Sequence, residues 1–120
     1  MIKLPPLNRL RILAGMLRLV AQKHDEQRYS CDRRYNESGI CLACEFVADD
    51  YCQETGANWR DTSHCRDDID RVLRHMQEGY GAHAFLNPFP HGAQWHEWNQ
   101  RATMCLLMAE WIEDRIKELS

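Results

Sequence analysis

The last third of the sequence constrains the fold most, because its apolar residues recur at alternating intervals of four and three positions. This spacing is typical of a helix that buries a seam against another helix. The seam consists of Trp98, Ala102, Cys105, Ala109, Ile112, Ile116 and Leu119. A second apolar stripe beside it consists of Met104, Leu107, Met108 and Trp111. We therefore predict a long C-terminal helix over about 93–119 and expect it to be the central helix of the fold.

Three further segments have helical patterns, over about 5–27, 37–54 and 64–78. The third is the clearest, because its apolar residues fall in one narrow arc with charged residues elsewhere. That arc consists of Cys65, Ile69, Val72, Leu73 and Met76. No segment shows a convincing strand pattern. The sequence predicts an all-α fold, a compact bundle of about four helices in a single domain spanning 1–120.

An irregular segment rich in aromatic residues and histidine precedes the C-terminal helix. Its glycines and prolines, in "GYGAHAFLNPFPHG", are incompatible with regular structure. Long ordered loops often carry function, so its side chains are candidates for contact with a ligand or partner. These candidates are His83, Phe85, Phe89 and His91. Alternatively, the aromatic residues cover an open end of the bundle and the histidines are solvated.

Six cysteines raise the question of a metal site. Cys41 and Cys44 lie one helical turn apart, and Cys31 and His64 could complete a zinc site if loops bring them together. However, the spacing lacks the second close pair that makes a zinc signature specific. Five of the six cysteines fall on apolar helix faces, where cysteine behaves as a small buried hydrophobe. We therefore expect no cofactor and keep a zinc-stabilised interaction module as an alternative.

Charge is distributed unevenly along the chain. Residues 1–35 carry eight Lys/Arg and three Asp/Glu, whereas residues 36–120 carry seven and fifteen. The basic third either meets an anionic partner or docks on the acidic remainder of its own fold. Its candidate binding residues are Arg11, Arg18, Arg28, Tyr29, Arg33, Arg34 and Tyr35. Arginine beside tyrosine suits a protein interface or a small anionic ligand. The net charge of −3 makes duplex nucleic acid a poor partner.

Apolar residues outnumber what the main helix faces need. The surplus positions are Ile12, Met16, Leu19, Leu42, Phe46, Met104, Leu107 and Trp111. Extended apolar patches usually mark interfaces, so we expect a homodimer or a stable protein partner. Alternatively, the helix over 5–27 is itself central and buries both of its stripes.

Two pairs of carboxylates at helical spacing offer an enzymatic alternative, Glu45 with Asp49 and Asp67 with Asp70. The pattern is loosely similar to all-α nucleotide pyrophosphohydrolases, a resemblance that implies Mg²⁺ and a bound phosphate chain. It departs from that family because these carboxylates lie opposite the apolar arcs and would face solvent. No P-loop, HExxH motif or nucleophile elbow is present. The sequence therefore favours a protein without catalytic activity.

No apolar run is long enough for a membrane span, and Arg9, Arg11 and Arg18 interrupt the only stretch that resembles a signal peptide. We therefore expect a cytoplasmic protein with reduced cysteines. The expected function is binding, and possible inhibition by occlusion, of a macromolecular partner. Such compact helical proteins are common among phages and mobile elements, an analogy of type only. The alternative is a pocket protein that sequesters or hydrolyses a small anion such as a nucleotide.

Overall fold

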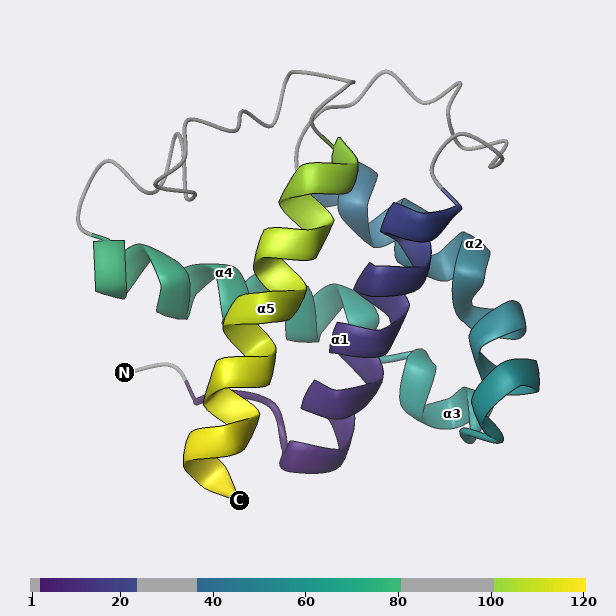
Figure 1. Ribbon diagram of the computed structural model, residues 1–120, viewed down its shortest axis with the longest axis horizontal. Coiled ribbons are helices and arrows are strands. Elements are labelled where there is room, and N and C mark those ends of the chain that lie inside the picture. Colours follow the sequence, from purple (N-terminus) through teal and green to yellow (C-terminus); the bar gives the residue numbers. More distant parts are fainter. Residues whose placement is uncertain (1–2, 24–36, 81–100) are drawn as a thin grey trace.

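The structure is a computed structural model that describes residues 3–23, 37–80 and 101–120, with side chains over 3–23, 44–76 and 105–120. This part of the chain contains five helices and no strand (Figure 1). They are α1 (Leu7–Gln22), α2 (Glu37–Thr55), α3 (Trp59–Thr62), α4 (Cys65–Tyr80) and α5 (Arg101–Leu119). The all-α prediction is confirmed. The irregular segment predicted before the last helix needs a correction at its start, because Gly79 and Tyr80 belong to α4. Its remaining residues lie outside the described residues.

Local signals set the helix ends. Pro6 precedes α1, and its carbonyl accepts a hydrogen bond from Leu10 N at 2.9 Å. At the end of α2, Gly56 adopts the left-handed conformation (φ +73°) and donates its N–H to the Cys52 carbonyl. Glycine reaches this conformation without steric cost, which explains why α2 ends where the sequence predicted. The short helix α3 was not predicted, because four residues are too few to show a periodicity.

The centre of the described bundle is α1, which contacts each of the other four helices. In Figure 1, α5 lies alongside α1, its main neighbour. The predicted C-terminal helix is present from Arg101 to Leu119, and its predicted first part (93–100) lies outside the described residues. The central position belongs to α1, the alternative that the sequence left open. A helix with neighbours on several sides buries more than one stripe. The buried residues of α1 are Leu10, Leu13, Ala14, Met16, Leu17, Leu19 and Val20.

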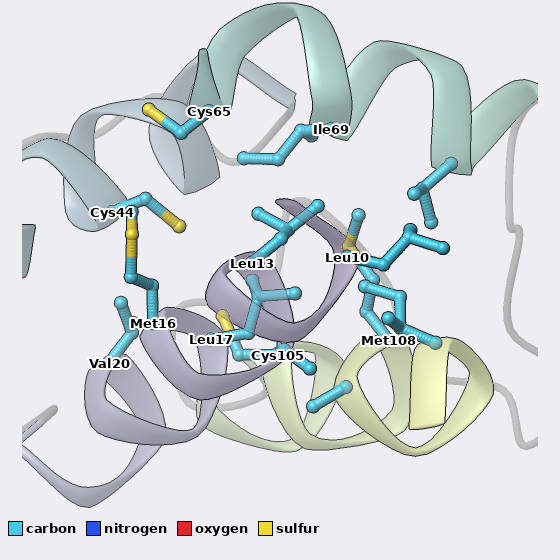
Figure 2. Packing of buried hydrophobic residues seen from close by; sticks show 14 of the residues in the cluster. Leu10, Leu13, Met16, Leu17, Val20, Cys44, Cys65, Ile69, Cys105 and Met108 are labelled. Carbon is cyan, nitrogen blue, oxygen red and sulfur yellow. The ribbon is translucent and has the colours of Figure 1, made fainter. Parts of the chain in front are cut away.

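Three of the cysteines contribute to this core. Cys44, Cys65 and Cys105 are buried, and none of them forms a disulfide. Figure 2 shows Cys105 of α5 beside Leu17, in the layer between α1 and α5. Cys44 of α2 lies near Met16 in the same view. The prediction that these three cysteines act as small hydrophobes is confirmed; the position of Cys31 and the side chain of Cys41 lie outside the described part.

Gly15 allows the close approach of α1 and α2. A Cβ atom at this position would lie 2.5 Å from Cε2 and 2.9 Å from Oη of Tyr51. The Tyr51 ring, partly buried against the core, occupies the space that any larger residue would need. Glycine inside a helix normally lowers stability by about 0.5–1 kcal/mol relative to alanine, so its presence here reflects packing.

We expect Gly15→Ala to lower the free energy of unfolding by about 1–3 kcal/mol, because the Tyr51 ring must leave its position against α1. Urea denaturation of the purified variant measures this change. The control is the same substitution in a Tyr51→Ala background, where the space is open and alanine should instead be neutral or stabilising. Greater stability of Gly15→Ala in the otherwise unchanged protein would contradict this account of the α1–α2 contact.

Candidate functional site

Two arginines of α1 and the lysine that follows its last residue pair with acidic residues of three different helices. The pairs are Arg9 with Asp68 of α4 (3.3 Å), Arg18 with Glu113 of α5 (2.6 Å) and Lys23 with Asp50 of α2 (2.8 Å). The sequence left open whether the basic N-terminal third would meet a partner or dock on the acidic remainder of its own fold. These three cations pair with acidic residues of the same chain.

Arg18 forms a bidentate ion pair with Glu113. Its Nε and Nη2 donate to the two carboxylate oxygens of Glu113 at 2.7 and 2.6 Å. This hydrogen bonding raises the pKa of Arg18 and lowers the pKa of Glu113. Both side chains remain more than a third exposed, so the pair adds little to stability. Arg18 was a predicted binding residue, and its guanidinium is engaged within the fold.

The other predicted binding residues are placed only in part. Arg11 lies exposed on α1. The remaining basic and aromatic candidates lie outside the described residues, namely Arg28, Tyr29, Arg33, Arg34 and Tyr35. The same holds for the loop candidates His83, Phe85, Phe89 and His91. A binding role for these two segments stays a prediction.

The predicted oligomer interface needs a correction at two positions. Met16 and Leu19 are buried in the chain's own core, where α1 is surrounded by its neighbours. They cannot face a second copy, and the surplus stripe on this helix is explained by its central position. Phe46 is 48% exposed on α2. Ile12, Leu107 and Trp111 are partly buried against the core, and the side chains of Leu42 and Met104 lie outside the described part.

Of the four possible zinc ligands, only Cys44 and His64 have side chains in the described residues. Cys44 is buried and His64 is exposed, and no group of three potential ligands converges in the described residues. The zinc alternative also needs Cys31 and Cys41, whose side chains are not described.

Two carboxylates of the pyrophosphohydrolase-like pattern are paired with arginines at the surface. Glu45 accepts a hydrogen bond from Arg66 at 2.6 Å, and Asp70 pairs with Arg74 at 3.2 Å. The second of these pairs lies within α4 at the i,i+4 spacing. All four side chains are more than a third exposed, so these carboxylates face solvent as the sequence indicated.

A buried ion pair that the sequence analysis missed joins α1 to α4. The Asp68 side chain is only 3% exposed and the Arg9 side chain 19%. Asp68 Oδ1 and Arg9 Nε are buried and form no hydrogen bond within the described structure. They border a crevice too narrow to admit a water molecule. Its lining, here called the Asp68 crevice, consists of Arg9, Ile12, Leu13, Met16, Asp61, Thr62, Cys65 and Asp68.

Burial dominates the electrostatics of this crevice. Burial raises the pKa of Asp68, although Arg9, His64 and Arg71 all favour the ionised form. Burial also raises the pKa of the Cys65 thiol, so this cysteine is protonated and a poor nucleophile at neutral pH. The sequence did hold a signal for Asp68. Its spacing of three residues from Cys65 places it at the edge of the apolar arc of α4.

The second feature that sequence reasoning missed is Trp59, the first residue of α3. Its side chain is 65% exposed, the largest exposed fraction among the exposed large hydrophobic residues of the described structure. The Arg60 guanidinium lies 5.6 Å from the centre of its ring, a cation–π distance. Asn58 caps α3, because its Oδ1 accepts a hydrogen bond from Arg60 N at 3.0 Å. Asn58 before Trp59 was the only sequence signal for this turn.

The chain has no match among protein-family models, curated proteins or solved structures. Among the described residues, no helix combines the length and the apolar character needed to cross a membrane. The two features of the described surface that point to a function are the Asp68 crevice and the exposed Trp59.

Proposed function

We propose that this chain is a non-enzymatic helical binding protein that recognises, and thereby occludes, a macromolecular partner. The observation that carries the proposal is the exposure of Trp59. Tryptophan is highly buried on average in folded proteins. Together with arginine, it is also among the residues that contribute most binding energy at protein interfaces. Trp59 and Arg60 present both residue types side by side on α3.

The backbone around Trp59 is held in place before any partner arrives. Thr62 is buried, and its hydroxyl donates a hydrogen bond to the Trp59 carbonyl at 2.6 Å. The cap from Asn58 holds the other end of the same turn. A side chain on an ordered turn loses less conformational entropy on binding than one on a mobile loop. This rigidity supports α3 as the centre of the contact.

The proposal keeps the other elements that the sequence suggested. A basic segment with Arg33 and Arg34 would extend the contact. A second copy of the chain is one candidate partner. Native mass spectrometry of the purified protein would reveal it as a dimer mass. The proposed location is the cytoplasm, a reducing compartment in which cysteines stay as thiols. Inhibition of a host protein, as small phage proteins perform it, would follow from occlusion of the partner's surface.

We expect Trp59→Ala to weaken partner capture at least tenfold, because truncation of a central interface tryptophan typically costs about 2 kcal/mol or more. Tagged protein is used as bait under native conditions, and the recovered partner is quantified against the unmodified bait. A parallel Arg33→Glu/Arg34→Glu bait tests the basic segment and should also lose the partner.

Two control baits separate binding from folding. Trp59→Phe keeps an aromatic ring and should retain most of the capture, while Leu119→Ala removes another exposed apolar side chain, at the end of α5, and should change nothing. Circular dichroism confirms that each bait is folded. Equal recovery of the partner by Trp59→Ala and by the unmodified protein would refute a contact centred on α3.

A further inference from the structure

We propose that Asp68 is a proton-binding site built into the junction of α1, α3 and α4, and that mild acid tightens this junction instead of loosening it. The junction is the Asp68 crevice, to which α1 contributes Arg9, α3 contributes Asp61 and Thr62, and α4 contributes Cys65 and Asp68. Because α3 also carries Trp59, protonation of Asp68 would change the packing of α3 and thereby the position of the Trp59 side chain. This extension to Trp59 rests on the proposed function, whereas proton binding by Asp68 does not.

The pair of Arg9 with Asp68 is the most buried of the three ion pairs described above and has the longest contact distance. Arg9 Nη2 lies 3.3 Å from Asp68 Oδ1, and that oxygen forms no hydrogen bond within the described structure. The more exposed pairs of Arg18 and Lys23 have distances of 2.6 and 2.8 Å. Charge-assisted hydrogen bonds normally measure about 2.7–2.9 Å.

Desolvation also disfavours the charged form of this pair. A buried ion pair offsets the loss of hydration only when its geometry is good and the remaining polar atoms are hydrogen-bonded. Neither condition holds here, because Arg9 Nε and Asp68 Oδ1 both lack a hydrogen-bond partner in the described residues. The crevice has no room for a water molecule that could supply one. A neutral carboxyl group carries a much smaller desolvation cost, so the site favours proton uptake.

The charged groups around Asp68 act in both directions. Burial has the largest effect and favours the protonated form. Three neighbours favour the carboxylate, namely Arg9 of α1, Arg71 of α4 and His64, which precedes α4. Asp67 favours the protonated form. Asp61 of α3 lines the same crevice and adds negative charge on that side. His64 is exposed, and its influence on the pKa of Asp68 is smaller than that of burial.

The linkage between proton binding and stability gives the sign of the effect. Because the pKa of Asp68 is raised in the folded state, the folded chain holds a proton over a pH range in which the unfolded chain has lost it. The contribution of Asp68 to stability is therefore largest below its unfolded pKa and declines as the pH rises through its folded pKa. Glu113 behaves in the opposite way, because its pKa is lowered by Arg18 and its contribution is lost on acidification.

The direct test is a carbon-13 NMR titration of the aspartate side-chain carboxyls, with the exposed neighbour Asp67 as the internal reference. We expect the titration midpoint of Asp68 to lie above that of Asp67. We also expect the backbone amides of Arg60, Asp61 and Thr62 to shift with the Asp68 midpoint and to lose this response in Asp68→Asn. A midpoint at or below that of Asp67 would overturn the proposal, because it would show that Arg9 outweighs burial.

A second measurement isolates the stability effect from that of all other carboxylates. Urea unfolding is followed from about pH 4 to pH 8 for the unmodified chain, Asp68→Asn and the matched control Asp67→Asn. The stability of the unmodified chain relative to Asp68→Asn should fall as the pH rises, and this fall should exceed the one relative to Asp67→Asn, because Asp67 is exposed. A constant or rising difference for Asp68→Asn would refute the proposal.

The extension to Trp59 has its own outcome. Partner capture by the unmodified bait should depend on pH over the range in which Asp68 titrates, and capture by Asp68→Asn should not. If Asp68 titrates as expected while the two baits capture the partner alike at every pH, the proton site stands and its influence on Trp59 is refuted. If no bait captures a partner, the proposed function fails and the NMR result on Asp68 is unaffected.

Discussion

Replacing Met16 with alanine is expected to lower the free energy of unfolding by about 2–5 kcal/mol, the usual cost of truncating a large core side chain. Met16 is fully buried in α1, and Figure 2 shows it near Cys44 of α2. The loss comprises the hydrophobic contribution of the removed atoms and the cavity left between two packed helices. Chemical denaturation followed by far-ultraviolet circular dichroism measures it.

The matched control is Phe46→Ala on the outer side of α2. Phe46 is 48% exposed, and removal of a surface side chain usually changes stability by no more than about 0.5 kcal/mol. The contrast between the two variants shows whether the surplus apolar stripe of α1 (Ile12, Met16 and Leu19) belongs to the core or to an interface. If Met16→Ala unfolded at the same denaturant midpoint as the unmodified chain but had a different oligomeric mass, Met16 would belong to an interface.

Removing Arg9 should be far more costly than neutralising Asp68. Arg9→Met keeps much of the side-chain volume and leaves the Asp68 carboxylate buried without a counter-charge, a change that typically costs on the order of 3 kcal/mol. Asp68→Asn keeps the shape of the side chain and removes the charge. Arg9 still reaches solvent, since 19% of its side chain is exposed, so we expect this variant to stay within about 1 kcal/mol of the unmodified chain.

Both variants are compared by urea denaturation at neutral pH. The double variant Arg9→Met/Asp68→Asn should recover most of the stability lost in Arg9→Met, because it leaves no isolated charge in the crevice. If Asp68→Asn proved as costly as Arg9→Met, the ion pair would be a net source of stability despite its long contact distance. That result would contradict our account of the Asp68 crevice.

Much of the fold could be predicted because the helical spacing of apolar residues and the residues that end helices indicate the same helix bounds along most of the chain. The arc from Cys65 to Met76 identified α4, and Gly56 identified the end of α2. The central helix could not be identified with certainty, because α1 and α5 both carry two apolar stripes and the sequence does not show which helix has neighbours on more sides. Tertiary packing decides this, and it favours α1.

The candidate site was harder to predict for a different reason. Arg9 and Asp68 belong to helices far apart in the sequence, and only the packing of α4 on α1 brings them together. The helical position of Asp68 at the edge of an apolar arc could have flagged it as a buried carboxylate. Trp59 lies on a helix of a single turn, for which the only local signal is the cap residue Asn58.

The pairing of α1 with α5 bears on how the chain folds. Arg18 and Glu113, which tie these helices together, are 95 positions apart in a chain of 120 residues. The layer that Figure 2 shows between Leu17 and Cys105 therefore joins the first helix to the last. During synthesis the face of α1 that packs against α5 stays uncovered until α5 has left the ribosome. Such long-range closure slows folding and prolongs the exposure of this face of α1, so the nascent chain is expected to depend on chaperones until α5 is complete.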